Sequence, residues 1–198
     1  MKHPLFSLIA TLTLSIAALP AVRAAADVKE VAVLKTSAGE MVVEFWPEVA
    51  PKTVENFIKL AKEGFYDGTA FHRIIKDFMI QGGDPLSKDP GKEAMWGTGD
   101  SGKRLKAEFN ERKHDFGVIS MARSANPDSA SCQFFICLGP TPQLDSKYTA
   151  FGRLIKGADV LKKLGSTPVG QSPSGEPSKP LERVTLEKVT VVPADSVK

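Results

Sequence analysis

Two of the polar side chains in segment 71–84, Arg73 and Gln81, are set among apolar residues, and their types and spacing could do chemistry. The segment predicts two short strands, 71–75 and 78–81, separated by a polar turn and ended by two glycines. A few polar groups set in an apolar lining are typical of a binding pocket, in which an arginine donates hydrogen bonds to a bound acceptor. The alternative is an ordinary core hairpin whose Arg73 extends its charged end to water.

Two motifs in this order resemble the signatures of one known family. Phe71-His72-Arg73-Ile74-Ile75 with Phe78-Met79-Ile80-Gln81-Gly82-Gly83-Asp84 resembles the first motif of cyclophilin-type peptidyl-prolyl cis-trans isomerases. Ser120-Met121-Ala122-Arg123, followed by Ser131-Cys132-Gln133-Phe134-Phe135-Ile136, is similar to the second motif, and Phe151-Gly152-Arg153-Leu154 resembles the strand after it. The resemblance covers residues 31–192. It implies an isomerase, without cofactor or metal, that accelerates rotation about X-Pro bonds in unfolded or extended polypeptides and so assists their folding.

The resemblance also assigns roles to residues of this chain. It implies catalytic roles for Arg73, Gln81 and Phe78. It implies substrate binding by His72, Met79, Ala122, Arg123, Gln133, Phe135, Leu144 and Tyr148. The proline pocket would be formed by the apolar members of this set, for which plain core packing is the alternative. Arg73 would donate a hydrogen bond to the prolyl nitrogen while the bond is twisted, and Gln81 would orient Arg73 and bond a substrate carbonyl.

Three positions depart from the family pattern. Gln143 stands where many eukaryotic members have a tryptophan that lines the drug-binding groove, and Tyr148 stands where they have a histidine. We therefore expect weak or no binding of cyclosporin, with catalysis retained. Arg123 replaces the usual asparagine and could alter the preference at the residue before proline.

Other functions leave weaker signals in the sequence. The residues 97–102 match the dinucleotide motif G-x-G-x-x-G, but no strand–turn–helix context surrounds them. The cyclophilin resemblance instead implies a loop that walls one end of the peptide groove. A hydrolase using Ser120, His72 and Asp84 would lack the Gly-x-Ser-x-Gly turn that exposes a nucleophile. Isolated histidines do not have metal-ligand spacing. The remaining alternative is a module that binds proline-containing chains without turnover.

The elements that position these residues follow from local patterns. Strands are predicted at residues 31–36, 41–45, 71–75, 78–81, 118–122, 133–138, 149–154 and 183–192. A helix is predicted from Pro51 to Gly64, because a proline opens the segment, apolar side chains recur at helical spacing and a glycine ends it. A second helix is predicted over 158–164, with Asp159 favourable in its first turn and Gly165 ending it. Residues 85–110 and 166–180 are predicted as loops. These patterns predict a mainly β fold, a closed eight-stranded antiparallel β-barrel capped by two α-helices, as the cyclophilin resemblance also implies.

The first residues predict export. Residues 1–24 combine a positive start, an apolar run from Leu5 to Leu19 and a small-residue cleavage site, which is the pattern of a signal peptide. The domain is then 25–198, a bacterial protein of the periplasm, with secretion as the second choice and no membrane attachment after cleavage. We expect a monomer.

Charge and cysteines agree with such a protein. The chain has 26 basic and 23 acidic residues, and because Lys2 and Arg23 leave with the predicted signal peptide, the mature chain has a formal charge of +1. A nearly neutral chain gives no reason to expect a nucleic-acid partner. Cys132 and Cys137 lie in an apolar segment, where a strand would separate their Cα atoms by about 16 Å, too far for a disulfide. We expect two free thiols.

Overall fold

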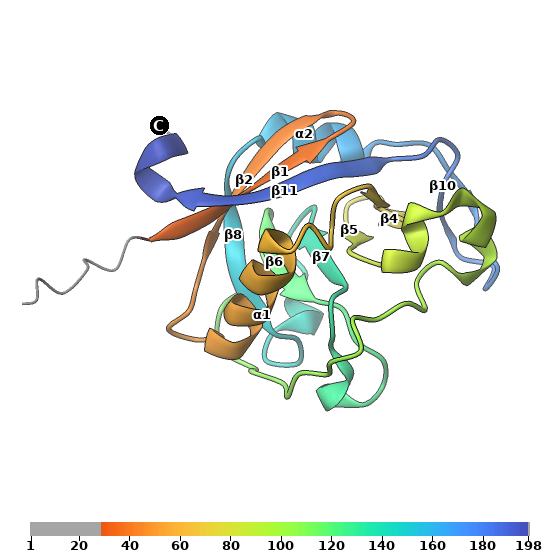
Figure 1. Ribbon diagram of the computed structural model, residues 1–198. Helices are drawn as coiled ribbons and strands as arrows, with labels where there is room; N and C mark the ends of the chain where they lie inside the picture. The colour runs from red at the N-terminus through yellow and green to blue at the C-terminus, as the bar shows by residue number, and fades with distance from the viewer. Residues whose placement is uncertain (1–28, 198) are drawn as a thin grey trace, which may run out of the picture.

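The centre of the fold is an antiparallel sheet that curls around an apolar interior (Figure 1). The computed structural model describes residues 29–197. Within them the sheet has nine strands in the order β3-β11-β1-β2-β8-β6-β7-β5-β4. The strands are β1 (Glu30–Thr36), β2 (Gly39–Phe45), β3 (Thr69–Ala70), β4 (Arg73–Ile75), β5 (Met79–Gly82), β6 (Val118–Met121), β7 (Phe134–Cys137), β8 (Ala150–Lys156) and β11 (Thr185–Pro193).

The prediction of a closed eight-stranded barrel is wrong, because this sheet is an open half-barrel. Its two edge strands, β3 and β4, follow each other in the chain and are joined only by Phe71-His72. Antiparallel neighbours need a chain reversal, and parallel neighbours need a crossover of about a dozen residues or more. A two-residue link provides neither. The backbone at this seam is satisfied elsewhere, since the amide of Ala70 donates to Ser87 Oγ (2.8 Å) and that of Phe71 to the carbonyl of Val184 (2.9 Å).

Two helices pack on the curled sheet, as predicted. Figure 1 shows α2 (Ala158–Gly165) at the top of the sheet and α1 (Pro51–Lys62) below it. Pro51 opens α1, and Gly64, with a φ of +68°, follows its end. The helix packs Phe57 against the rings of Tyr66 at 4.9 Å and Phe134 at 5.5 Å, measured between centroids. This aromatic cluster fills the interior of the half-barrel.

A distant carboxylate caps the start of α1. Glu108 accepts hydrogen bonds from the amides of Lys52 (3.0 Å) and Thr53 (2.8 Å) and from the Thr53 hydroxyl (2.7 Å). The first amides of a helix have no partner within it, and negative charge is favourable at this end. Glu108 therefore ties the long segment after β5 to the helix.

The long segment after β5 is more ordered than the loop predicted at residues 85–110. It contains two short 3-10 helices, η1 (Pro85–Lys88) and η2 (Pro90–Met95). Asp84 is fully buried and accepts hydrogen bonds from the amides of Leu86 (2.7 Å), Gly97 and Gly99 (3.4 Å). One carboxylate thus ties the start of this segment to its middle.

The loop predicted at residues 166–180 is also wrong, because it forms a hairpin of its own. Its strands β9 (Val169–Gln171) and β10 (Pro177–Pro180) pair as a separate two-stranded sheet. The strands are short and rich in proline, glycine and serine, so they carry no alternating pattern. Figure 1 shows β10 beside β4, with which it is in contact.

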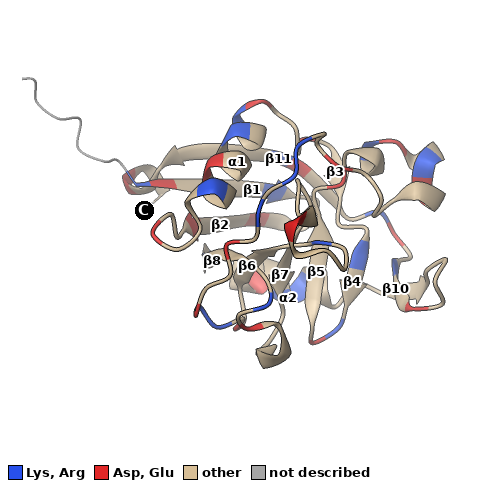
Figure 2. Ribbon diagram, turned by 90° about the horizontal axis from the view of Figure 1, so that it is seen from below, with Lys and Arg blue, Asp and Glu red and all other residues tan. Residues whose placement is uncertain are grey.

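Two further 3-10 helices, η3 (Pro127–Ser129) and η4 (Pro142–Leu144), lie in the loops around β7, and η5 (Ala194–Val197) follows β11. Cys132 and Cys137 are buried free thiols. In residues 29–197 no helix has the length and apolarity needed to cross a membrane. Figure 2 shows basic and acidic segments interspersed along the ribbon. The predicted signal peptide, residues 1–24, lies outside the described residues.

Candidate active site

An apolar pocket of about 250 Å³ lies between β4, β5, β7 and the loops that follow β6 and β7. Phe135 and Met79, which are 5% and 2% exposed, form its floor from the neighbouring strands β7 and β5. Tyr148 packs edge-on against Phe135, with 5.8 Å between the ring centroids. The pocket is lined by Arg73, Phe78, Met79, Gln81, Ala122, Arg123, Phe135, Leu144 and Tyr148. The structure therefore brings together nine of the eleven residues singled out in the sequence.

The arginine lies at the rim of this pocket. Arg73 faces Gln81 across the β4–β5 pair. Its Nη1 donates to Gln81 Oε1 (3.2 Å) and contacts the sulfur of Met79 (3.7 Å). Its Nε and Nη2 donate to Glu176 Oε2 (2.7 Å) and Oε1 (2.9 Å). Because the side chain is 33% exposed, the guanidinium is both fixed and accessible from the pocket.

A chain of amides links this arginine to a second cavity. Gln81 Nε2 donates to Gln133 Oε1 (3.1 Å), and Gln133 Nε2 donates to the carbonyls of Gly97 (3.0 Å) and Gly99 (2.8 Å). Each acceptor fixes the orientation of the next amide, so Gln81 presents its oxygen to Arg73. The contact through which Gln81 could orient Arg73 is therefore present. The orienting role itself stays a prediction.

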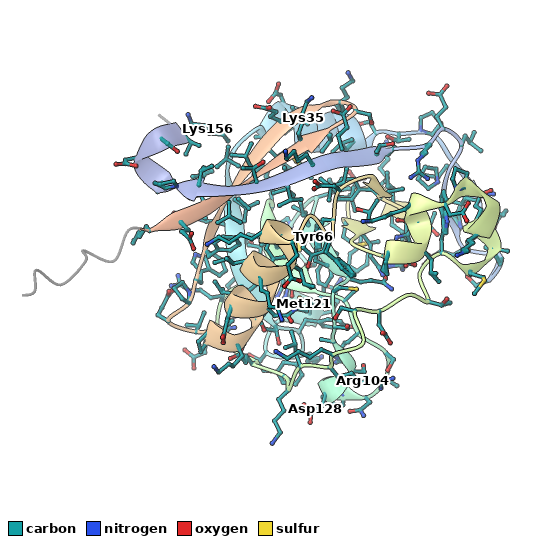
Figure 3. The ribbon with its side chains drawn as sticks, in the orientation of Figure 1. Lys35, Tyr66, Arg104, Met121, Asp128 and Lys156 are labelled. Carbon is teal, nitrogen blue, oxygen red and sulfur yellow. The ribbon has the colours of Figure 1, made fainter. Side chains whose placement is uncertain are left out.

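The second cavity, of about 270 Å³, adjoins the first, and the two share Gln81, Ala122 and Arg123. Residues of the rejected dinucleotide match, from Gly97 to Asp100, form one wall. The loop after β6 forms the other wall, and an isolated bridge between Leu105 and Ala130 joins the two loops. Figure 3 shows Arg104 and Asp128, one from each loop, at the lower edge of the molecule.

Arg123 closes the groove between the two cavities. Its guanidinium carbon lies 4.4 Å from the centre of the Tyr148 ring, and its Nη2 donates to the carbonyl of Lys147 (2.9 Å). A guanidinium over an aromatic face is a favourable contact that also orders both side chains. Arg123 and Tyr148, two positions that depart from the family pattern, therefore contact each other.

His72 is placed differently from its prediction as a groove residue. It does not line either cavity, and its ring packs beside Gly97, below the groove. Both ring nitrogens are buried and have no hydrogen-bond partner among the described residues. Burial lowers the pKa of His72, which favours the neutral ring.

A polar triad of two buried residues and the partly exposed Asp145 lies under the pocket, and the sequence analysis missed it. His114 Nδ1 lies 3.2 Å from Asp145 Oδ1, and His114 Nε2 lies 3.0 Å from Ser120 Oγ. The imidazole stacks at 6.1 Å on Phe135, so the triad supports the pocket floor. Burial lowers the pKa of His114, although Asp145 opposes this shift. No motif spacing links the three residues, and only the fold brings them together.

The same triad argues against the hydrolase alternative. That hypothesis paired Ser120 with His72 and Asp84, whereas the structure pairs Ser120 with His114. Ser120 has no exposed surface, so its hydroxyl cannot reach a substrate carbonyl. Within residues 29–197 no group of three or more His, Cys, Asp or Glu side chains has a geometry that could hold a metal ion.

A curled antiparallel sheet with two helices packed on it is the cyclophilin fold. The family described as cyclophilin type peptidyl-prolyl cis-trans isomerase/CLD matches residues 31–191. The chain belongs to this family, and the enzyme class predicted from the two motifs, peptidyl-prolyl cis-trans isomerase, is confirmed.

Relatives from several organisms resemble the chain over most of its length. Peptidyl-prolyl cis-trans isomerase ppi1 of Schizosaccharomyces pombe is 45% identical over 151 residues, 75% of this chain and 92% of its own. Peptidyl-prolyl cis-trans isomerase cypE of Dictyostelium discoideum is 42% identical over 159 residues, 79% of this chain and 94% of its own.

Solved structures show the same fold. A cyclophilin type isomerase of Cryptosporidium parvum, crystallised in the presence of the dipeptide Ala-Pro, superposes with a TM-score of 0.72 and 32% identity over 82% of this chain and 98% of that chain. Cyclophilin AquaCyp293 of Hirschia baltica has a TM-score of 0.65 and 26% identity, over 81% of this chain and 73% of that chain.

Proposed function

We propose that this isomerase acts on X-Pro bonds of exported proteins and assists their folding, with Arg73 stabilising the twisted amide without covalent chemistry. The observation that carries the mechanism is the guanidinium of Arg73, held at the rim of an apolar pocket by Gln81 on one edge. Crystallisation of the Cryptosporidium parvum relative in the presence of Ala-Pro supports a proline-containing peptide as the substrate.

The enzyme has to lower the rotation barrier by only part of its height. Rotation about an X-Pro bond is opposed by a barrier of about 18 to 20 kcal/mol, because the twisted state loses amide conjugation. Shortening a step of tens of seconds to about a millisecond needs roughly a 10⁴-fold acceleration, or about 5 to 6 kcal/mol. The prolyl nitrogen regains a lone pair only in the twisted state. A donor aimed at that nitrogen therefore stabilises the transition state more than either planar isomer.

Arg73 supplies part of this free energy and the pocket supplies the rest. A hydrogen bond from a charged group contributes about 1.5 to 3 kcal/mol. The proline ring would lie on Phe135 and Met79, against Phe78 and Leu144, while the preceding carbonyl turns outside the pocket. A pocket preformed by packed side chains fixes one end of the amide, and the orientation it imposes lowers the remaining barrier. Gln81 would orient Arg73 and bind a substrate carbonyl.

The test separates turnover from binding. We expect Arg73→Ala to lower the rate of catalysed isomerisation of an Ala-Pro peptide at least about tenfold, because one charge-assisted hydrogen bond is lost. The peptide should still bind the apolar pocket. Rates are measured in a coupled assay, and binding is measured by NMR titration of the same peptide. Equal rates for both proteins would instead indicate that the pocket binds proline-containing chains and that Arg73 takes no part in turnover.

The cellular compartment and the oligomeric state of the enzyme are also part of the proposal. The leader-like pattern in residues 1–24 supports export of a bacterial protein to the periplasm, with secretion as the second choice. Amino-terminal sequencing of protein recovered from periplasmic extract is expected to begin close to residue 25. Retention of Met1 in a cytosolic fraction would contradict this proposal. We further propose a monomer, which sedimentation can check.

Weak or absent cyclosporin binding follows from Gln143. That residue lies in η4 beside Leu144, which lines the proline pocket. A tryptophan there would add an aromatic wall, worth about 1 kcal/mol or more of contact. Gln143→Trp is therefore expected to tighten cyclosporin binding about fivefold or more, as measured by calorimetry. Unchanged weak binding would place the cause elsewhere in the groove.

A further inference from the structure

The guanidinium of Arg73 is held by a carboxylate that lies 103 residues further along the chain. Glu176 accepts from Nε at 2.7 Å and from Nη2 at 2.9 Å, which is the parallel, two-bond geometry preferred by arginine and carboxylate. Of the three arginine–carboxylate ion pairs in residues 29–197, this is the one joined by two hydrogen bonds. It is also the one in which both side chains are no more than 36% exposed.

The backbone around Glu176 holds the carboxylate in place. Glu176 ends the turn of the β9–β10 hairpin, where its carbonyl accepts from the amide of Ser172 (2.7 Å) and its amide donates to the Ser172 hydroxyl (3.2 Å). Gly175 takes the positive φ of +82° that the turn requires. The following strand β10 contacts β4, the strand that carries Arg73 (Figure 1). The hairpin therefore presents Glu176 to the arginine from a fixed position.

Glu176 contacts the guanidinium on the side away from the substrate pocket. Arg73 lines the proline pocket, whereas Glu176 lines neither of the two cavities of the groove. Glu176 occupies the Nε/Nη2 edge, and Gln81 occupies Nη1. With Nε and Nη2 held by Glu176 and Nη1 held by Gln81 and Met79, the guanidinium keeps one plane at the rim of the pocket.

We propose that Glu176 is a positioning residue that fixes Arg73 for its contact with the prolyl nitrogen. This inference rests on the proposed role of Arg73. An arginine side chain loses much rotational freedom when it is ordered, and a partner that orders it before the substrate binds removes that cost from the transition state. The hydrogen bonds from Arg73 also lower the pKa of Glu176, so the carboxylate is ionised at neutral pH.

The opposite role would give the opposite result. If Glu176 competed with the substrate for the guanidinium, its removal would free Arg73 and raise the rate. If it positions Arg73, its removal loosens an interaction made only in the transition state, which lowers kcat and leaves KM nearly unchanged.

The experiment compares Glu176→Ala and Glu176→Gln with a matched control, Glu93→Ala. Glu93 forms a 3.0 Å ion pair with Lys179 on the same hairpin but does not contact Arg73. We expect kcat on an Ala-Pro peptide to fall about threefold to tenfold in Glu176→Ala, with KM within about twofold. The kcat of Glu176→Gln is expected to fall less, because glutamine keeps one acceptor oxygen and the shape of the side chain. Glu93→Ala is expected to match the wild type.

Two further measurements do not depend on the size of the rate change. The Nε–H signal of Arg73 in NMR is expected to exchange slowly with water in the wild type and rapidly in Glu176→Ala. Adding Glu176→Ala to Arg73→Ala is expected to cause no further loss of rate, because the carboxylate acts through the guanidinium.

The outcomes separate the two claims. An unchanged or increased rate in Glu176→Ala, with Arg73→Ala inactive, would overturn the positioning role alone. The same would follow if Glu93→Ala lost as much rate as Glu176→Ala, since the hairpin rather than the carboxylate would then be responsible. Full activity of Arg73→Ala would overturn the proposed mechanism and this inference with it.

Discussion

Replacing Arg73 by lysine keeps the positive charge and removes the geometry on which the proposed mechanism depends. The arginine donates from Nε and Nη2 to Glu176 and from Nη1 to Gln81 while it lines the proline pocket. Lysine has three donors at a single point, and its ammonium cannot contact Glu176, Gln81 and a prolyl nitrogen together. We expect the ammonium to pair with Glu176, the one charged partner at the site, and to leave the pocket rim empty.

The expected loss follows from one charge-assisted hydrogen bond. Such a bond contributes about 1.5 to 3 kcal/mol, and each 1.4 kcal/mol added to the barrier slows the reaction about tenfold. Arg73→Lys should therefore lower kcat/KM by roughly 10- to 150-fold. The rate is measured on an Ala-Pro peptide in a coupled assay, after subtraction of the uncatalysed isomerisation. Arg73→Ala is expected to lose at least as much.

A matched control isolates the position from the type of substitution. Arg153 in β8 donates from Nε to Glu44 (2.6 Å) and is 60% exposed, away from both cavities of the groove. Arg153→Lys is therefore expected to keep the wild-type rate. If Arg73→Lys kept a rate within about twofold of the wild type, positive charge alone would be sufficient and the directional argument would be refuted.

Three further predictions concern pH and thiol chemistry. The isomerisation rate should be nearly flat from about pH 6 to 8, because arginine stays charged and the pKa of Glu176 lies below its ordinary value of 4.5; a bell-shaped profile would implicate a titrating base. The unfolding midpoint should fall between pH 7 and pH 5, because burial lowers the pKa of His114 and the unfolded chain then binds more protons than the folded chain. Thermal scans of His114→Gln should show a smaller fall, and an equal fall would assign the effect to other groups. Neither thiol should react with a thiol reagent at pH 8 until the protein is unfolded, since burial raises the pKa of Cys132 to about 12 and that of Cys137 to about 11; rapid labelling of the folded protein would contradict their burial.

Local patterns predicted the parts of the site that lie close together in the chain. The residue types over 71–81 predict two short strands separated by a polar turn, and the structure has this hairpin, with Arg73 opposite Gln81 on β4 and β5. A proline at the first helical position and an apolar stripe predict α1 from Pro51. The two motifs brought Phe135 into the same set, and it forms the floor of the pocket with Met79. Each of these inferences needs only a few consecutive residues.

Other features depend on contacts between distant segments and could not be predicted in this way. Counting strands suggested closure, but the order of the sheet depends on which strands pair, and the two-residue link between β3 and β4 leaves an open seam. Glu176 lies in a turn rich in serine, glycine and proline, where nothing local indicates a partner. The pairing of His114 with Ser120 and Asp145 likewise arises only when three loops and strands meet.

The pairing of β1 with β11 has a practical consequence for attaching this enzyme to something else. Glu30 lies opposite Pro193, and the amide of Ala194 donates to the carbonyl of Lys29 (2.7 Å), so the two ends of the described chain leave the fold together. Figure 1 shows them on the left, with β4 and β10 on the right. A tether or fusion partner joined at either end would therefore hold the enzyme by the side away from β4, the strand that carries Arg73.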